Sequence, residues 1–131
     1  AHNFPILNLN HINVKNEDGV SYLQAMSPVD CIFLDPARRN EHGGKTVAIS
    51  DCEPDVAELE ELLLNKAGQV MVKLSPMLDL SLALKELQHV QEVHIISAYQ
   101  GDTGRTAFRI HPRTGAVQRM QLYQRTGKLS L

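Results

Sequence analysis

The sequence has little net charge, few cysteines and no long apolar run, and each of these absences excludes a class of protein. Its 131 residues carry a formal charge of −2, which argues against binding nucleic acid through bulk positive charge and leaves only a local basic patch. No apolar run approaches the roughly 20 residues that a membrane-spanning helix needs. The length suits a single domain.

The cysteines and histidines do not follow the spacing of a metal site. Cys31 and Cys52 belong to no C-x-x-C motif, so neither a disulfide scaffold nor a zinc site is indicated. The six histidines show no H-E-x-x-H spacing, and the adjacent Asp51, Cys52 and Glu53 cannot easily converge on one ion. We therefore expect no metal, and reduced thiols in a cytoplasmic protein.

A phosphate-binding loop is also missing. The string GGKT at 43–46 is similar to the end of a Walker loop, but that motif needs a glycine five residues before Gly44, where this chain has Arg39. The P-loop interpretation fails for this reason.

What the sequence does contain is an alternation of strand and helix patterns. Strands are predicted at 11–16, 29–35, 69–76 and 92–99, helices at 18–26, 55–66 and 79–89, a long loop at 40–53, and two antiparallel strands within 105–123 around the turn HPRTG. Residues 1–10 are typical of the end of a helix followed by a loop. This order predicts a layered α/β domain with a mostly parallel sheet that ends in an antiparallel hairpin.

Three predicted helices have recognisable boundaries and faces. Asp18 and Asp79 are expected N-caps, and Pro54 and Gly68 bound the middle helix. Within that helix the apolar spacing predicts a buried face and a solvent-facing one, the buried face with Val56, Leu59, Leu62, Leu63 and Ala67, the other with Glu58, Glu60 and Glu61. The strand at 29–35 is mostly apolar, which predicts that both of its faces are covered.

The predicted strands end in polar strings, NEDG, LDPARR and KLSP. Ligands of open parallel sheets bind beyond the carboxyl ends of the strands, so these strings are candidates for a site. Pro36 and Pro76 would end the strand ladders. Asp-Pro and Ser-Pro are also ordinary turn formers, and Arg38 and Arg39 are equally compatible with solvated side chains and with a planar grip on phosphate or carboxylate.

Three of these strings, IFLDPARR, DCEPD and KLSPMLD, in this order, carry a family resemblance. The chain resembles the C-terminal two-thirds of a class I S-adenosylmethionine-dependent methyltransferase, and in particular the bacterial methyltransferase-like proteins with a THUMP-like domain. The resemblance covers residues 1–99, with 100–131 as a C-terminal hairpin region. It implies a Rossmann-like, three-layer methyltransferase fold in one partial domain.

The resemblance also implies roles for individual residues. Asp18 and Gly19 would lie near the adenine of S-adenosylmethionine, and Asp35 with Pro36 would form the turn beside the transferred methyl group. Lys73 and Ser75 would line the same cleft from the next strand, with Lys73 counted as catalytic and Ser75 as substrate-binding. Arg38 and Arg39 would hold a substrate phosphate. The acceptor would be a nitrogen of RNA or of another nucleobase-like group.

The chain departs from this family in one respect. It has no G-x-G turn and lacks the acidic strand end that normally binds the ribose, so the first two strands of the family's sheet are missing. Those strands normally lie between the third and the fourth, which leaves 11–16 without a neighbour and one edge of 29–35 open. We expect a fragment or one half of a split pair, inactive and a poor cofactor binder alone, with the missing N-terminal part of the same protein as its partner.

Two other classes remain open from the sequence. A non-catalytic module of the same fold could bind RNA or protein, and the tail carries a basic bias from Arg105, Arg109, Arg113, Arg119 and Arg125. A solvated hairpin face explains the same arginines. A flavodoxin-like regulatory domain would need a phosphate-binding first strand, which the sequence does not show.

Overall fold

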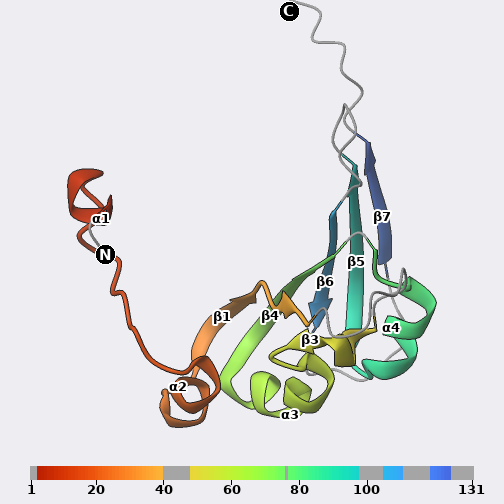
Figure 1. Ribbon diagram of the computed structural model, residues 1–131, viewed down its shortest axis with the longest axis horizontal. Coiled ribbons are helices and arrows are strands. Elements are labelled where there is room, and N and C mark those ends of the chain that lie inside the picture. Colours follow the sequence, from red (N-terminus) through yellow and green to blue (C-terminus); the bar gives the residue numbers. More distant parts are fainter. Residues whose placement is uncertain (1–2, 40–47, 76, 98–104, 111–118, 125–131) are drawn as a thin grey trace, which may run out of the picture.

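The computed structural model describes residues 3–39, 48–75, 77–97, 105–110 and 119–124, and the side chains of all of these up to residue 95. The strands that follow the apolar runs form a five-stranded sheet in the order β1-β4-β6-β5-β7, seen in Figure 1. Its members are β1 (Val29–Leu34), β4 (Ala67–Leu74), β6 (Arg105–Ile110), β5 (Val90–Ser97) and β7 (Arg119–Gln124). A second sheet pairs the short strands β2 (Ala37–Arg38) and β3 (Cys52–Glu53).

The sheet combines parallel and antiparallel pairs. β1 runs parallel to β4, and β5 runs parallel to β7. β6 lies between β4 and β5 and is antiparallel to both. The α/β class is therefore confirmed. A mostly parallel sheet was predicted, whereas two of the four strand pairs in the described sheet are parallel and two are antiparallel. The hairpin prediction is wrong, because β6 and β7 each pair with β5 and not with each other. The predicted turn HPRTG, residues 111–115, lies outside the described residues.

The described part of the chain also has five helical segments: α1 (Asn3–Ile6), α2 (Gly19–Ala25), η1 (Ile49–Asp51, a 3-10 turn), α3 (Val56–Lys66) and α4 (Leu80–Glu86). Carboxylates cap the three longer helices. Asp18 accepts the Ser21 N–H at 2.8 Å and Asp79 the Leu82 N–H at 3.0 Å, as predicted. Asp55, predicted as the first helical residue, is the N-cap of α3 and accepts the Ala57 N–H at 2.9 Å. Gly68 is not a helix stop, since α3 ends at Lys66 and the chain passes directly into β4.

The core lies on one face of the sheet. Residues from α3, α4 and the inward positions of β4 and β5 are buried together, with Val56, Leu63, Val70, Val72, Leu74, Ala83 and Val93 among them. Leu23 of α2 belongs to the same cluster. Within the described residues the arrangement is thus a sheet covered by helices on one face, and the second helical layer of the predicted three-layer fold is not seen. No helix in the described part of the chain is long and apolar enough to cross a membrane.

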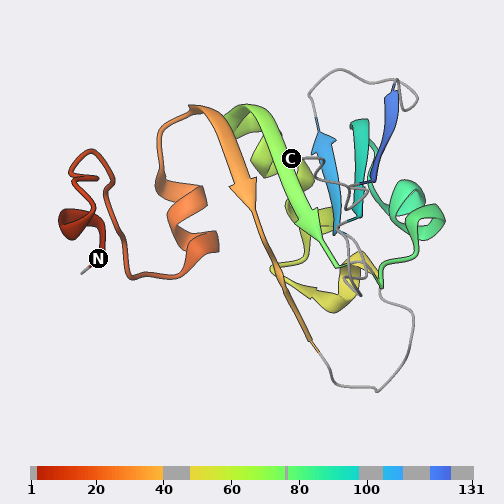
Figure 2. The ribbon, with the colours of Figure 1, turned by 90° about the horizontal axis from the view of Figure 1, so that it is seen from above.

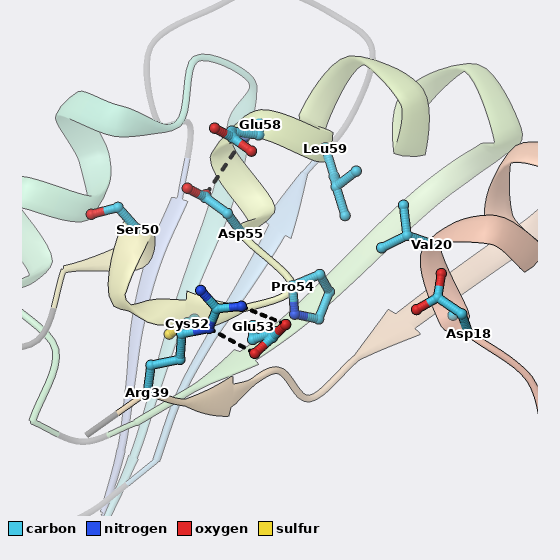
Figure 3. A pocket seen from close by; sticks show the side chains of 11 residues that line it. Asp18, Val20, Arg39, Ser50, Cys52, Glu53, Pro54, Asp55, Glu58 and Leu59 are labelled. Atoms are coloured by element: carbon cyan, nitrogen blue, oxygen red, sulfur yellow. Dashed lines mark hydrogen bonds and ion pairs between the residues drawn. The ribbon is translucent and has the colours of Figure 1, made fainter. Parts of the chain in front are cut away.

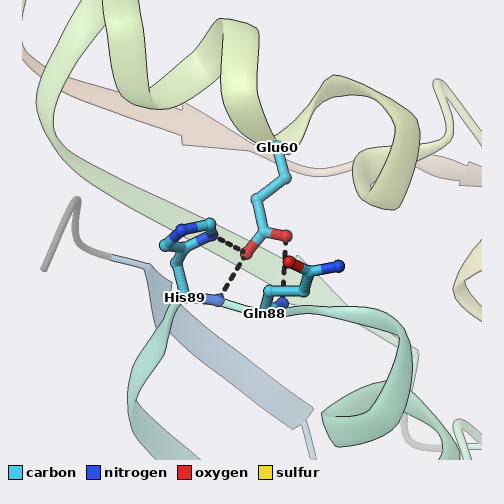
Figure 4. A network of polar contacts seen from close by, with 3 residues as sticks. All are labelled: Glu60, Gln88 and His89. Atoms are coloured by element: carbon cyan, nitrogen blue, oxygen red, sulfur yellow. Dashed lines mark hydrogen bonds and ion pairs between the residues drawn. The ribbon is translucent and has the colours of Figure 1, made fainter. Parts of the chain in front are cut away.

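A buried carboxylate joins α3 to the connection between α4 and β5. Glu60 is only 4% exposed and accepts the N–H groups of Gln88 at 3.0 Å and His89 at 2.8 Å, as Figure 4 shows. The His89 Nδ1 atom lies 3.4 Å from the same carboxylate. The prediction that Glu60 faces water is wrong, because a paired carboxylate can be buried at a helix position that spacing alone assigns to solvent.

The N-terminal part of the chain differs from the rest. Residues 11–16 form no strand, so the prediction of a strand there is wrong. Within the described residues no strand pairs with them, and an extended segment without a partner forms no ladder. Figures 1 and 2 show residues 3–17 running past α2 on the β1 side, away from the sheet. β1 itself is mostly exposed, which contradicts the prediction that both its faces are covered.

Candidate functional site

Two of the predicted catalytic residues meet at the carboxyl ends of β1 and β4. The parallel register pairs Leu34 with Val72, so the next residue along each strand, Asp35 and Lys73, lies at the same edge. The Lys73 Nζ atom donates a hydrogen bond to Asp35 Oδ2 and forms an ion pair with it. The Asp35 side chain is 52% exposed and that of Lys73 is 34% exposed, so a ligand can reach the pair.

The neighbouring predicted residues have mainly local roles in the described structure. Pro36 follows Asp35 and leads into β2. The Ser75 hydroxyl accepts the N–H of Met77 at 3.2 Å, which shapes the turn after β4. Pro76 lies outside the described residues. The structure therefore places Asp35, Lys73 and Ser75 at one end of the parallel pair, as the polar strings predict.

The two arginines after β1 are held by the small β2–β3 sheet. The Arg39 N–H donates to the Asp51 carbonyl at 2.8 Å, and its guanidinium grips Glu53 with two contacts, Nε to Oε2 at 2.7 Å and NH2 to Oε1 at 2.6 Å. Figure 3 shows this fork. Hydrogen bonding and the positive charge of Arg39 lower the pKa of the Glu53 carboxyl. Arg38 pairs with Cys52 along the backbone ladder.

A pocket of about 500 Å³ opens beside this fork. It is bounded by the start of α2, the β2–β3 sheet and the start of α3, and its lining is Asp18, Gly19, Val20, Arg39, Ser50, Cys52, Glu53, Pro54, Asp55, Glu58 and Leu59. A Cβ placed on Gly19 would meet nothing within 4 Å, so this part of the wall is open.

The lining of this pocket is mostly acidic. Four carboxylates, those of Asp18, Glu53, Asp55 and Glu58, line it together with one guanidinium, which Glu53 engages. The Ser21 hydrogen bonds lower the pKa of Asp18, which favours its charged form. Such a lining favours a ligand with positive charge or with N–H and O–H donors, and it disfavours phosphate. Arg39 could hold a substrate phosphate only by leaving Glu53.

The predicted site residues thus fall into two groups. Asp18, Gly19 and Arg39 share the acidic pocket, whereas Asp35 and Lys73 form the pair at the strand ends and do not line it. The groups are joined by β2, since Asp35 and Arg39 stand four residues apart in the chain.

Glu53 lines the pocket, but the sequence analysis considered it only as a possible metal ligand and did not predict it as a site residue. Its partner is Arg39, 14 residues away, and the intervening residues 40–47 lie outside the described part of the chain. The only sequence signal was the polar string DCEPD, in which Glu53 is one of three carboxylates.

Comparison with solved structures finds a similar fold. Over 89% of its length the chain matches a crystal structure described as that of a "putative methyltransferase" from Porphyromonas gingivalis W83, with a TM-score of 0.74 and 36% sequence identity. The match spans 29% of that longer chain. Searches of protein-family models and of curated proteins found no match. The chain is therefore similar in fold and sequence to part of a methyltransferase-like protein.

Proposed function

We propose that the Asp35–Lys73 pair and the acidic pocket form part of the active site of an S-adenosylmethionine-dependent methyltransferase. Its acceptor is a nitrogen of RNA or of another nucleobase-like group. The observation that carries this proposal is the Asp35–Lys73 ion pair at the carboxyl ends of adjacent parallel strands, where ligands of such sheets bind. The similarity to the Porphyromonas gingivalis structure supports the same conclusion. The THUMP-like relationship and the cytoplasmic location are proposed on the sequence resemblance alone.

The acidic pocket fits the proposed cofactor in charge. S-adenosylmethionine has a sulfonium and an ammonium group, and carboxylates are suitable neighbours for both. Asp18 and Gly19 would hold it from the start of α2, where the wall is open at Gly19. The bound cofactor would supply an electrophilic methyl group. The chain's own residues then have to orient the acceptor and receive its proton.

Asp35 is the residue suited to the acceptor. Its Oδ2 atom accepts from Lys73, so the carboxylate is held in one orientation and a half-exposed face remains for an acceptor N–H. Methyl transfer is an in-line displacement, in which positioning supplies much of the rate. A carboxylate that takes the acceptor proton contributes typically about 10²- to 10⁴-fold. Lys73 is a positioning residue that acts through Asp35.

The first test is binding. S-adenosylhomocysteine should be titrated calorimetrically into this chain and into the whole polypeptide encoded by its natural reading frame. We expect binding by the whole polypeptide and weak or no binding by the 131 residues alone. If neither binds and the whole polypeptide still binds RNA, the chain is a non-catalytic RNA-binding module instead.

The second test is catalysis by the whole polypeptide with tritium-labelled S-adenosylmethionine and RNA. Asp35→Asn should lower kcat by about 10²-fold or more, because an amide cannot take the acceptor proton. Lys73→Gln should lower kcat less and shift the pH–rate profile. Glu61→Gln, an exposed change on α3, is the matched control and should leave kcat unchanged. Equal rates for Asp35→Asn and the control would refute the role of Asp35.

A further inference from the structure

A single lysine joins the last turns of α2 and α3. Lys66, the last residue of α3, donates hydrogen bonds from its Nζ atom to the carbonyl of Gln24 at 3.0 Å and to that of Met26 at 2.7 Å. These two carbonyls belong to the last turn and the C-cap of α2, where a helix has no backbone donor of its own to satisfy them. The helix dipole also favours a cation at this end. Lys66 therefore holds the end of a neighbouring helix.

Both of these helices begin at the acidic pocket. Asp18 and Gly19 line the pocket from the start of α2, and Asp55 and Glu58 line it from the start of α3. The pocket thus lies between the first turns of the two helices, and Lys66 fixes their last turns to each other. The spacing of the two pocket walls depends on the angle between the helices, which this attachment restricts.

The position of α2 depends on few other contacts. The helix has seven residues and buries one of them, Leu23, and its C-cap Met26 is partly buried against the core. The segment 3–17 before it forms no strand. A helix this short is not stable by itself, so tertiary contacts have to hold it in place. The two hydrogen bonds from a charged donor are therefore a substantial part of its attachment.

We propose that Lys66 is a positioning residue for the acidic pocket, which sets the spacing between the walls formed by α2 and α3 and thereby the affinity for the ligand. The described lining of the pocket does not include Lys66, so it acts through α2 and not by touching the ligand. The inference rests on the proposed function for its ligand probe, S-adenosylhomocysteine. The position of the walls has a separate readout.

The position of the walls can be measured without a ligand. In the whole polypeptide of the natural reading frame, Lys66→Met removes the ammonium donors and keeps an unbranched apolar side chain. Methyl NMR should show shifted signals for Val20 of α2 and Leu59 of α3, which both line the pocket (Figure 3). The signals of Val93, fully buried on β5, should stay unchanged. Amide hydrogen exchange within 19–26 should become faster, because a less tightly held helix opens more often.

The effect on the ligand is measured by calorimetry and by kinetics. Lys66→Met should raise the Kd of S-adenosylhomocysteine by about five- to tenfold, because ordering a displaced wall uses part of the binding free energy. The KM for S-adenosylmethionine should rise while kcat changes little, since Asp35 and Lys73 lie at the ends of β1 and β4 and not on α2. Lys66→Arg keeps charged donors and should restore most of the affinity. Lys85→Met, at an exposed lysine in the last turn of α4, is the matched control and should leave Kd unchanged.

Three outcomes would overturn the proposal. Unchanged Val20 and Leu59 signals in Lys66→Met would mean that Lys66 does not position the walls. Shifted signals with an unchanged Kd would mean that the spacing of the walls does not set the affinity. An equal loss of affinity in Lys66→Arg and Lys66→Met would mean that the donated hydrogen bonds are not the cause. If the unaltered polypeptide does not bind S-adenosylhomocysteine, the proposed function fails, and the methyl signals and amide exchange alone decide whether Lys66 positions the walls.

Discussion

β1 and β4 are neighbouring parallel strands of similar apolar composition, yet their environments differ. On β4, Val70, Val72 and Leu74 are buried against α3 and α4, whereas β1 has no fully buried residue. The difference comes from position in the sheet, since among the described strands β4 has a neighbour on each side and β1 has one neighbour. An apolar strand pattern therefore indicates that a strand can be buried. Whether it is buried depends on the strands and helices next to it.

The largest difference in stability is expected between two variants, one with a side chain truncated on β4 and one with a side chain truncated on β1. Leu74→Ala should lower the free energy of unfolding by about 2–5 kcal/mol, because it leaves a cavity in the core. Phe33→Ala removes a larger side chain but should cost less than about 0.5 kcal/mol in this chain, because Phe33 is exposed. Urea denaturation of both variants measures the contrast. Equal losses would mean that β1 is covered in solution.

A similar contrast exists on α3 between two adjacent glutamates. Glu60→Ala should cost about 2–4 kcal/mol, because it leaves the buried N–H groups of Gln88 and His89 without their acceptor. Glu61→Ala, at an exposed position, should change stability by less than about 0.5 kcal/mol. Thermal or urea unfolding distinguishes them. A Glu60→Gln variant should lie between the two, because its amide oxygen still accepts.

The smallest effect on stability is expected from the exposed ion pair between Arg39 and Glu53. The folded-state pKa of Glu53 lies below its ordinary value of 4.5. The contribution of the pair to the free energy of unfolding is therefore complete when the pH is above that ordinary value. It is lost as the pH falls through the lower, folded-state pKa. Carboxyl NMR shifts of Glu53 should show this acidic midpoint, and Arg39→Gln should move it up towards the ordinary value. An unchanged midpoint in the variant would show that Arg39 does not set it.

The sequence predicted the features that local chemistry determines. Asp18 and Asp79 cap helices because their carboxylates reach the first backbone N–H groups, and the meeting of Asp35 with Lys73 follows from parallel strands ending at one edge. Features set by distant partners were missed. The burial of Glu60 depends on a turn 28 residues away, and the pairing of β7 with β5 depends on β6 occupying the other side of that strand.

The candidate site shows the same limit. The sequence assigned Asp18 and Asp35 to the cofactor and Arg39 to the substrate, whereas the structure places Asp18 and Arg39 in the acidic pocket and Asp35 in the strand-end pair. The engagement of Arg39 by Glu53 could not be deduced, because it requires the β2–β3 register. Charge counted along the chain does not show which carboxylate a guanidinium will select.

The insertion of β6 between β4 and β5 bears on how the protein assembles during its synthesis. β1, α3 and β4 all lie within residues 29–74, with the short β2, η1 and β3 between β1 and α3, and they can associate as soon as residue 74 has left the ribosome. β5 is made next, but its place in the sheet is reached only through β6, the antiparallel strand that follows it. The order of translation thus differs from the order of attachment, and β5 has to wait for a later part of its own chain.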